Sequence, residues 1–487
     1  MNKLLKINEK DNVAVALCNL KKGYTENGIT LLSDVPFGHK VLLCDLNCGE
    51  NVIKYGCPIG HVTENCKKGS YVHEHNLKTN LNEITEYSFD KPVAYTPEKT
   101  DITVNAYKRK NGKIGIRNEL WLIPTVGCVN KTAELLEKLY DGNEDCDGVY
   151  AFTHPYGCSQ MSSDQELTRK TLAALINHPN AGGVLIISLG CENSGFETLL
   201  PYLKDYDKER VKLLVCQNCE DELETGKELI NGLLSVMKND VREPVGIDKL
   251  VVGFKCGGSD AFSGITANAV CGAFNDKLTS CGASTILTEV PEMFGAENIL
   301  MARSISKDVF EKQVEMINGF KDYFSRYGMV CYENPSPGNH EGGITTLEEK
   351  SLGCVQKGGT SPVCDVLGFA EECNKSGLNL LYGPGNDMVS VTDLTAAGAH
   401  IILFTTGRGT PLGAPVPTLK LSSNTPLFEK KKGWLDFNCG GILDGETIEE
   451  NAEKLFALVI ETASGKKTKN EINGYRDIAL FKDGVTM

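Results

Sequence analysis

The sequence predicts an α/β protein: a small β-rich N-terminal domain, then a large α/β region with mostly parallel, doubly wound sheets. Up to about residue 80, short β-branched runs are separated by recurring glycines, and no sustained helical period is present. A polar stretch follows that contains Pro92 and Pro97, as is typical of a linker. Beyond residue 106, short apolar runs alternate with amphipathic helical stretches, which is the pattern of parallel sheets.

We therefore expect a β-rich domain at 1–81, a linker at 82–105, and α/β domains at 106–244 and 245–487 that together form the catalytic region. The polar stretch Lys238–Pro244 separates the two α/β domains. The expected strands are Leu120–Val126, Gly148–Thr153, Gly183–Leu189, Lys212–Cys216, Leu250–Lys255, Thr285–Thr288, Asn379–Tyr382 and Ile401–Thr405. The expected helices are Lys131–Leu139, Ser163–Ile176, Glu220–Met237 and Ser306–Tyr327.

Composition excludes some classes of function. The 487 residues carry a formal charge of −14, which argues against nucleic acid as a partner because phosphate contacts need clustered Lys and Arg. No apolar run approaches the roughly 18 residues that cross a bilayer, and the first residues lack the apolar stretch of a signal peptide. We expect a cytoplasmic protein without membrane partners, either monomeric or a homo-oligomer. Most of the 19 scattered cysteines are expected to be reduced and buried.

Chemically active side chains follow the predicted strands. Ligands of open α/β sheets bind outside the carboxyl ends of the strands, where loops converge. Cys, Glu, Asp and Gly recur there, in Gly127-Cys128, His154–Cys158, Gly190-Cys191-Glu192, Cys216–Cys219, Cys256–Asp260, Glu289–Glu292, Gly383–Asp387 and Gly407-Arg408-Gly409. The pattern predicts an enzyme site rich in thiols and carboxylates. No phosphate-binding loop of the Walker type and no strand-bound G-x-G-x-x-G motif is present, which argues against the common nucleotide sites.

Three further motifs leave alternatives open. In His73-Glu74-His75, a period of two puts both imidazoles on one side of a strand, which suits either a divalent metal or an exposed polar strand end. Arg117 precedes a strand and either binds a substrate carboxylate or forms a surface salt bridge. The stretch 334–339, with two prolines, is too rigid and polar for a helix or strand interior, so we expect a ligand-lining loop or a tight turn.

These motifs resemble those of the altronate/galactarate dehydratase family, nearly from end to end, and the chain length is nearer the altronate branch. The segments that carry the resemblance are Ile53–Gly56, Pro58–Gly60, Val72–Thr79, Gly115–Asn118, His154–Cys158, Gly190–Glu192, Cys256–Asp260, Ser263-Gly264, Glu289–Glu292, Asn334–Asn339, Thr405–Gly409 and Leu419–Leu421. The resemblance implies an N-terminal domain of the kind shared with sialate synthase and flagellar assembly proteins. It also implies Fe²⁺ or another divalent cation such as Mn²⁺, and dehydration of a sugar acid, with D-altronate to 2-dehydro-3-deoxy-D-gluconate as the first expectation.

Removing water across C2–C3 builds up enediolate charge, which a cation stabilises while a base and an acid move protons. We expect His73 and His75 to reach the site as metal ligands or proton-transfer groups, and Glu289 or Glu292 to act as base or acid. Further expected metal ligands are Cys158, Cys191, Glu192 and Cys256. The expected substrate-binding residues are Arg117 and Arg408 for the carboxylate, with Asn118, Ser259, Asp260 and Asn339.

Three other interpretations remain open at this point. The substrate is galactarate or another aldarate, the iron belongs to a cysteine-ligated iron–sulfur cluster, or the chain is a non-catalytic sugar-acid sensor.

Overall fold

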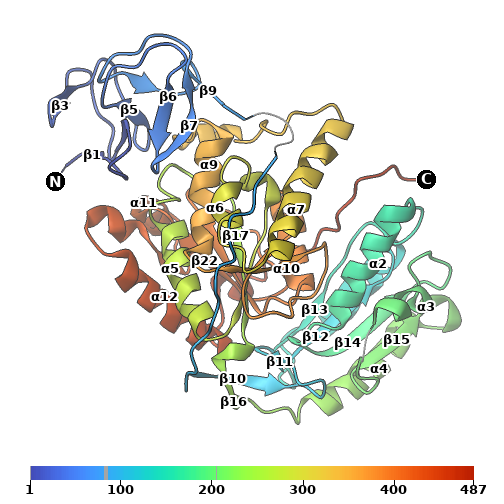
Figure 1. Cartoon of the computed structure of the whole chain (residues 1–487). Helices are drawn as coiled ribbons and strands as arrows, with labels where there is room; N and C mark the ends of the chain where they lie inside the picture. The colour runs from blue at the N-terminus through green and yellow to red at the C-terminus, as the bar shows by residue number, and fades with distance from the viewer. Residues whose placement is uncertain (1, 82–85, 204–205) are drawn as a thin grey trace.

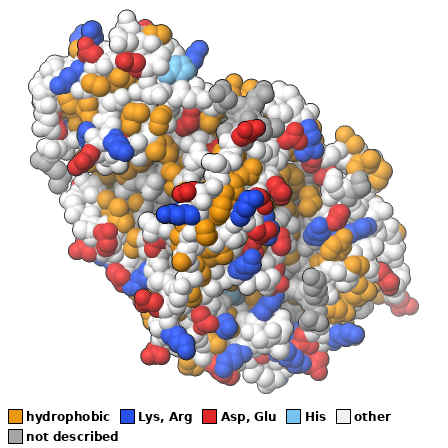
Figure 2. All heavy atoms as spheres, viewed as in Figure 1, with side chains coloured by type: hydrophobic (Ala, Val, Ile, Leu, Met, Phe, Trp, Pro, Cys, Tyr) orange, Lys and Arg blue, Asp and Glu red, His pale blue; other side chains and the backbone are white. Residues whose placement is uncertain are grey.

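A computed structural model describes residues 2–81, 86–203 and 206–487. The protein is a mixed α/β molecule with a β-rich N-terminus, as the sequence predicts (Figure 1). None of the helices in these residues is long and apolar enough to span a membrane. On the face shown in Figure 2, acidic and basic side chains are interspersed.

The N-terminal part consists of small antiparallel sheets. One has the order β1 (Leu4–Leu5), β2 (Val13–Ala16), β5 (Lys40–Leu42) and β8 (Tyr71–Val72). Another consists of β6 (Asn51–Lys54), β7 (Cys57–Val62) and β9 (Leu77–Lys78), and β3 (Thr25–Glu26) pairs with β4 (Ile29–Thr30). Gly69 adopts φ 86° where an added Cβ would lie 2.0 Å from the Thr30 carbonyl oxygen, so the turn requires glycine.

The predicted linker 82–105 includes residues 82–85, which lie outside the described part of the chain. Residues 86–102 form no helix or strand and run along the C-terminal part, where Val93 N–H donates to Ser304 O and Tyr95 Oη donates to Thr279 O. The strand β10 (Thr103–Lys108) then pairs antiparallel with β11 (Ile114–Gly115) and β16 (Glu243–Gly246).

A four-stranded parallel sheet follows, in the order β13 (Val149–Ala151), β12 (Glu119–Pro124), β14 (Ala181–Ser188), β15 (Val211–Val215). Successive β12 side chains belong to different apolar cores because strand residues alternate between faces. Leu120 and Leu122 pack with residues of α1 (Asn130–Leu139) and α4 (Glu222–Met237), whereas Trp121 and Ile123 pack with residues of α2 (Ser162–Ile176). The short helix α3 (Phe196–Leu199) follows β14.

The C-terminal part contains a seven-stranded sheet that is parallel throughout. Its order is β19 (Val363–Leu367), β20 (Gly377–Leu381), β18 (Ser284–Leu287), β17 (Val251–Cys256), β21 (Ile401–Thr406), β22 (Thr418–Ser422), β23 (Phe437–Asn438). Its helices are α5 (Ala267–Ser280), α6 (Glu297–Met301), α7 (Lys307–Arg326), α8 (Pro337–Glu341), α9 (Leu347–Cys354), α10 (Asp387–Ala396), α11 (Thr425–Lys430), α12 (Ile448–Ala463) and α13 (Lys469–Ile472). The sequence therefore predicted a large parallel sheet correctly.

Candidate active site

The structure distributes the predicted site residues over four places. His73 and His75 lie in the N-terminal part, and Asn339 lies opposite them on α8. Arg117 and Asn118 precede β12, at the amino end of the four-stranded sheet. Cys158, Cys191 and Glu192 follow β13 and β14 at its carboxyl end. The carboxyl end of the seven-stranded sheet holds Cys256, Ser259, Asp260, Glu289, Glu292 and Arg408. The predicted metal ligands thus belong to loops of separate sheets, and in the described residues no hydrogen bond or ion pair joins Cys158, Cys191 or Glu192 to the other three.

Arg117 is buried in an ion pair, not aimed at a strand-end loop. Its guanidinium donates to the Glu471 carboxylate over 2.7 and 3.0 Å and to the carbonyl oxygens of Thr462 and Lys466. Asn118 accepts a hydrogen bond from Arg109 and donates to Met237 O. The expectation that Arg117 and Asn118 bind substrate therefore has no support in their positions, because both hold the layers of the fold together.

A buried charge network occupies the carboxyl end of the seven-stranded sheet. Lys255, at the end of β17, pairs with Glu289 and lies 2.9 Å from Asp387. The Cys256 N–H donates to the other Glu289 oxygen over 2.9 Å, and Lys357 lies 3.4 Å from that oxygen. Glu289 therefore sits between two ammonium groups and a backbone donor, fully removed from solvent.

Glu292 forms the second half of this network. Lys350 Nζ lies 2.7 Å from one Glu292 oxygen, and Cys354 Sγ donates to the other over 3.1 Å. The ligand atoms of Cys256, Glu292 and Cys354 all lie within 4.8 Å of one another. We refer to Lys255, Cys256, Glu289, Glu292, Lys350, Cys354 and Lys357 together as the buried charge cluster.

The two glutamates have opposite pKa shifts. Burial and the neighbouring charge of Glu292 raise the pKa of Glu289 to about 8. Burial acts in the same direction on Glu292, but the positive charge of Lys350, with Lys255 and Lys357, outweighs it and lowers the pKa to about 2. One carboxyl is therefore neutral and its neighbour ionised at neutral pH, which is the arrangement of an acid–base pair.

The Cys256 thiol is also perturbed. A hydrogen bond with Cys354 is the main cause that lowers its pKa to about 5, against the effect of burial. Ser259 Oγ is within hydrogen-bond distance of the same sulfur. Cys256 is thus a buried thiolate in neutral solution, held by groups of its own loop and of α9.

Backbone strain coincides with this site. Glu289 has φ 72°, in the left-handed region that a non-glycine residue rarely adopts, where β18 turns into the short 3₁₀ helix Val290–Glu292. Tyr55, in the N-terminal part opposite, has φ 61°. Such conformations cost about 1–3 kcal/mol each and concentrate where a side chain must be aimed.

The N-terminal domain lies over this end of the sheet, next to α9 (Figure 1). Lys40 and Lys54 are buried and both bond to Glu349 of α9 over 2.8 Å, and Lys40 also donates to Gly343 O. Burial would raise the Glu349 pKa, yet the two lysines lower it to about 2. The cavity enclosed here has a volume of only about 10 Å³, and its lining includes Lys54, Tyr55, Ser259, Asp260, Lys350 and Cys354. That is about the space of one water molecule, so the site is closed in this conformation.

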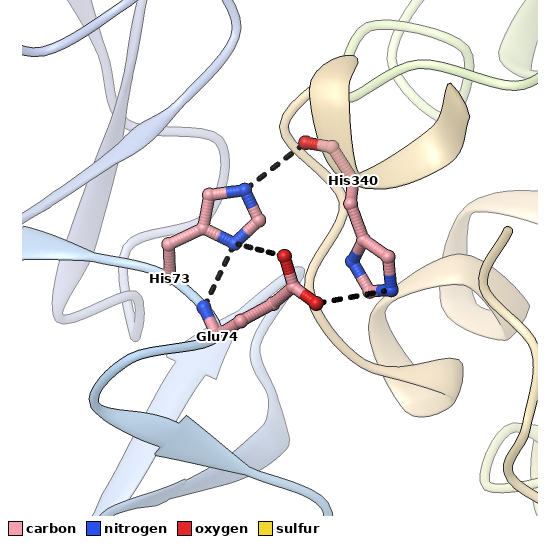
Figure 3. A group of neighbouring side chains, drawn as sticks. All are labelled: His73, Glu74 and His340. Atoms are coloured by element: carbon pink, nitrogen blue, oxygen red, sulfur yellow. Dashed lines mark hydrogen bonds and ion pairs between the residues drawn. The ribbon is translucent and has the colours of Figure 1, made fainter. Parts of the chain in front are cut away.

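A second group of ligand-type side chains joins the two parts nearby, as Figure 3 shows. His73 Nε2 hydrogen bonds with the carbonyl oxygen of His340, and the Glu74 carboxylate lies 3.9 Å from His73 Nδ1 and 3.5 Å from His340 Nε2. Burial, followed by the charge of Lys40, lowers the His73 pKa to about 4, so this imidazole is neutral at pH 7. The three side chains offer atoms within 4.8 Å of one another.

The expectation that His73 and His75 share one side of a strand is wrong. Residues 73–76 form a turn between β8 and β9, in which Asn76 N–H donates to His73 O and the Asn76 side chain accepts from His73 N–H. The turn buries His73 and exposes His75, whose ring centroid lies 5.4 Å from that of Tyr71. Asn76 therefore overrides the strand period that the sequence pattern suggested.

The remaining predicted residues organise the loops at this end. Asp260 is buried and accepts bonds from Ser263 of its own loop and from Ser423 and Asn424, so it joins the loop after β17 to the loop after β22. The Asn339 amide donates to Ser259 O and accepts from Ser336, which caps α8; the stretch 334–339 thus begins a short helix, where only a loop was expected.

Arg408 is half-exposed and pairs with Glu341 over 2.6 Å. Of the predicted substrate residues, its guanidinium is the one that solvent reaches.

Sequence reasoning missed the lysines of the cluster. Lys255 interrupts an otherwise apolar strand, Val251–Cys256, and a charge in such a run was a usable signal. Lys350 carries no such signal, because α9 is buried along its whole length and shows no amphipathic period. Lys357 lies in the short 3₁₀ helix Val355–Gly358 that follows, which is too short to show a period.

A larger cavity lies elsewhere. It has a volume of about 680 Å³ and is lined by residues at the amino ends of the strands, including Val251, Ser284 and His400. None of the predicted site residues lines it. Size alone is therefore a poor guide here, since the polar and strained groups converge at the opposite ends of the strands.

Sequence models of three protein families match successive parts of the chain. The Altronate/galactarate dehydratase SAF domain matches residues 2–80, the D-galactarate dehydratase/Altronate hydrolase second domain matches 106–238, and the D-galactarate/Altronate dehydratase C-terminal domain matches 247–486. The chain belongs to the altronate/galactarate dehydratase family, as the motifs predicted.

Curated relatives cover the full length. An altronate dehydratase of Escherichia coli strain K12 is 47% identical over 99% of both chains, and an altronate dehydratase of Bacillus subtilis strain 168 is 46% identical over 100% of both. A galactarate dehydratase (L-threo-forming) of Escherichia coli is 32% identical over 95% of this chain and 93% of its own. The similarity is therefore greater to these altronate dehydratases than to this galactarate dehydratase.

Proposed function

We propose that this chain is a hydro-lyase that dehydrates D-altronate to 2-dehydro-3-deoxy-D-gluconate. The observation that carries the proposal is the 46–47% identity to altronate dehydratases over the whole chain, against 32% to the galactarate dehydratase. The buried charge cluster supplies chemistry suited to the reaction, because its lysines stabilise the negative charge that develops on an enediolate.

Glu289 is the proposed acid. With a pKa of about 8 it holds a proton at neutral pH and can donate it to the hydroxyl that leaves C3. Glu292 is the proposed base for the C2 proton. A substrate carboxylate that shares Lys350 and Lys357 reduces the positive charge around Glu292, and this raises its pKa toward the range that a base needs.

Substrate entry requires the site to open. A six-carbon acid is far larger than a cavity of about 10 Å³, so the N-terminal domain and α8 must separate from the sheet ends when substrate binds. Arg408 is exposed and already paired with the Glu341 carboxylate, and we propose that it exchanges this partner for the substrate carboxylate.

We propose that a divalent cation, Fe²⁺ or a similar ion such as Mn²⁺, binds to His73, Glu74 and His340. Two imidazoles and a carboxylate within 4.8 Å of one another suit these ions, and His73 is neutral as a ligand must be. Ligation through one ring nitrogen of His73 replaces the hydrogen bonds that this nitrogen makes, with His340 O at Nε2 or with Glu74 N–H and Thr345 Oγ1 at Nδ1. The other group, Cys256, Glu292 and Cys354, fits a cation less well because three lysines already compensate it. Bound near the substrate, a divalent cation polarises the carboxylate next to C2.

The test is anaerobic turnover on a panel of aldonates and aldarates, with and without Fe²⁺ or Mn²⁺, measured as formation of 2-keto-3-deoxy acid. Metal-dependent activity on D-altronate is the expected result. Activity on galactarate instead would keep the mechanism and replace the substrate. Tight binding of a sugar acid by metal-loaded protein without turnover would overturn the proposal in favour of a sensor.

A further inference from the structure

A second set of strand-end side chains, outside the site described above, consists of exposed thiols. Five of the chain's cysteines are exposed: Cys44, Cys48, Cys128, Cys158 and Cys191. The last three follow β12, β13 and β14, which are adjacent in the order β13-β12-β14, at the same end of the four-stranded sheet. Cysteine is one of the most buried residue types, so three exposed thiols on three adjacent loops require a reason.

Each of these cysteines directly follows a glycine. Gly157 adopts φ 104°, and an added Cβ there would lie 2.0 Å from Thr125 O of the neighbouring loop. Gly190 adopts φ 122° with Gln217 at 2.9 Å from its Cβ position, and Gly127 has His154 O at 3.1 Å. The missing side chains let the loops approach closely. The three cysteines therefore lie on one rim, formed by the loops after β12, β13 and β14.

Backbone hydrogen bonds hold the loops in this arrangement. Gly127 N–H donates to Tyr156 O over 2.9 Å, and Ser194 N–H donates to Gly157 O over 3.0 Å. Glu192 links the loops as well, accepting bonds from Thr125 Oγ1 and Ser188 Oγ. The rim is therefore a built structure, and its thiols are not a chance scatter.

The thiols themselves are only weakly engaged. Cys158 Sγ donates to Asn193 Oδ1 over 3.2 Å, and Cys191 Sγ accepts from Gln217 Nε2 over 3.5 Å; both cysteines and Cys128 are free of disulfides. Cys216 follows β15, which is next to β14 in the sheet, so a fourth thiol lies on the adjoining loop.

The distances between the sulfur atoms distinguish a site for an iron–sulfur cluster from a site for a single metal ion. A single Zn²⁺ bound about 2.3 Å from each sulfur holds the sulfurs roughly 3.8 Å apart. Among the described residues, the sets with ligand atoms within 4.8 Å of one another do not include the three rim thiols, so at least one pair of these sulfurs lies farther apart than that. Iron–sulfur clusters are held by cysteine thiolates spread around several iron atoms.

We propose that Cys128, Cys158 and Cys191 bind an iron–sulfur cluster at the carboxyl end of the four-stranded sheet, with Cys216 as the fourth thiol within reach. This site is separate from the histidine group and goes beyond the proposed dehydration. The cluster consists of iron and inorganic sulfide, and each cysteine binds iron as the thiolate after losing its proton to solvent.

The test uses the full chain, purified without oxygen and reconstituted with iron and sulfide. We expect iron and acid-labile sulfide in equal amounts with a broad visible absorbance band. Cys128→Ser, Cys158→Ser and Cys191→Ser should each lower iron and sulfide about fivefold or more. The matched control is Cys44→Ser, at an exposed thiol of the N-terminal domain, which should keep both. Circular dichroism and thermal unfolding verify that each variant is folded.

Alkylation gives an independent readout that needs no variant. In the reconstituted protein the three rim cysteines should resist iodoacetamide although they are exposed in the structure, and removal of the cluster by chelator and oxidant should restore labelling. Iron or zinc without sulfide, or free labelling of the three thiols after reconstitution, would overturn the proposal. Altronate turnover measured on the same samples tests the proposed function separately, since its metal requirement rests on His73, Glu74 and His340.

Discussion

The carboxyl ends of the two parallel sheets differ in the burial and charge pairing of their reactive side chains. At the seven-stranded sheet, three lysines, two glutamates and two cysteines are buried and paired with one another. At the four-stranded sheet, the thiols are exposed, and in the described residues no lysine or arginine pairs with Glu192. Both ends use the same topology, but only one of them compensates its charges from within the protein.

The difference shows which end requires an external group. A buried charge is costly unless it is paired, so the compensated cluster needs no further ion to balance its charges. Exposed thiols carry no such cost and gain stability from a metal that they ligate. This contrast supports the proposed proton transfer at the seven-stranded sheet and the proposed metal binding by thiols at the four-stranded one.

Among the variants that test this difference between the two sheets, we expect the largest loss of activity from a change at Glu289. Glu289→Gln removes the proposed proton donor and leaves its size unchanged, and we expect kcat for altronate to fall about 10³-fold. Steady-state turnover with saturating metal measures it.

The matched control is Glu119→Gln, which changes another buried glutamate that pairs with Arg476 and Trp121. We expect it to lower the free energy of unfolding and to leave kcat of the folded enzyme unchanged. Equal activity losses in the two variants would mean that Glu289 is structural.

The next effect in size concerns the amino end of the four-stranded sheet. Arg117→Met leaves the buried Glu471 with Arg476, at 3.2 Å, as its cationic partner and the Thr468 N–H as a backbone donor. We expect a loss of about 3 kcal/mol or more in unfolding free energy. Denaturant unfolding measures the loss, and KM for altronate should stay the same. A large rise in KM in a stable variant would restore Arg117 as a substrate ligand.

Short apolar runs predicted strands that are buried on both faces, and amphipathic periodicity predicted helices that have one exposed face. Strand Leu120–Val126 was expected where β12 is Glu119–Pro124, and helix Ser306–Tyr327 where α7 is Lys307–Arg326. Helices α5 and α9 were missed because they are buried almost all round. In α5 the buried positions include Asn268 and Asn275, whose amides bond to Gly353 O and Gly358 O, so no apolar stripe is visible.

The site was predicted in part for a related reason. Rules for strand ends located Cys256, Glu289 and Cys191, since each directly follows a strand or ends one. These rules do not say which strand ends lie close together, however, so thiols of both sheets were assigned to one metal site. Lys350 and Cys354 reach the cluster from a helix, and Lys40 reaches Glu349 from another domain, through contacts that local sequence does not encode.

The pH dependence of activity sharpens the role of Glu289. A proton donor is lost when it ionises, so kcat/KM should fall as pH rises through about 8, by about tenfold per unit beyond it. Stability has the same sign: the neutral Glu289 contributes fully below the pKa of an unfolded glutamate, and this contribution is lost as pH rises through about 8.

A variant that removes a neighbouring positive charge tests whether the fall of kcat/KM at alkaline pH is caused by ionisation of Glu289. The positive charge of Lys357 lowers the Glu289 pKa, so Lys357→Gln should move the alkaline limb to higher pH. A limb that stays in place would assign the titration to another group.

The smallest effect is a difference in thiol reactivity between the two sheets in metal-free protein. Iodoacetamide attacks thiolates, and the lowered pKa of Cys256 enlarges its thiolate fraction at pH 7 by about 30-fold over an ordinary thiol. Against this, Cys256 is 2% exposed behind a nearly closed cavity, so it reacts only when the N-terminal domain opens. We expect burial to prevail, so that Cys128, Cys158 and Cys191 are labelled first and the labelling half-time of Cys256 is more than about tenfold longer, as followed by peptide mass spectrometry.

Lys40→Met, which weakens the contact to Glu349, should shorten the labelling half-time of Cys256 and leave that of Cys191 unchanged. If Cys256 is labelled first in the unaltered chain, the domain opens readily in solution and the closed cavity is not the resting state.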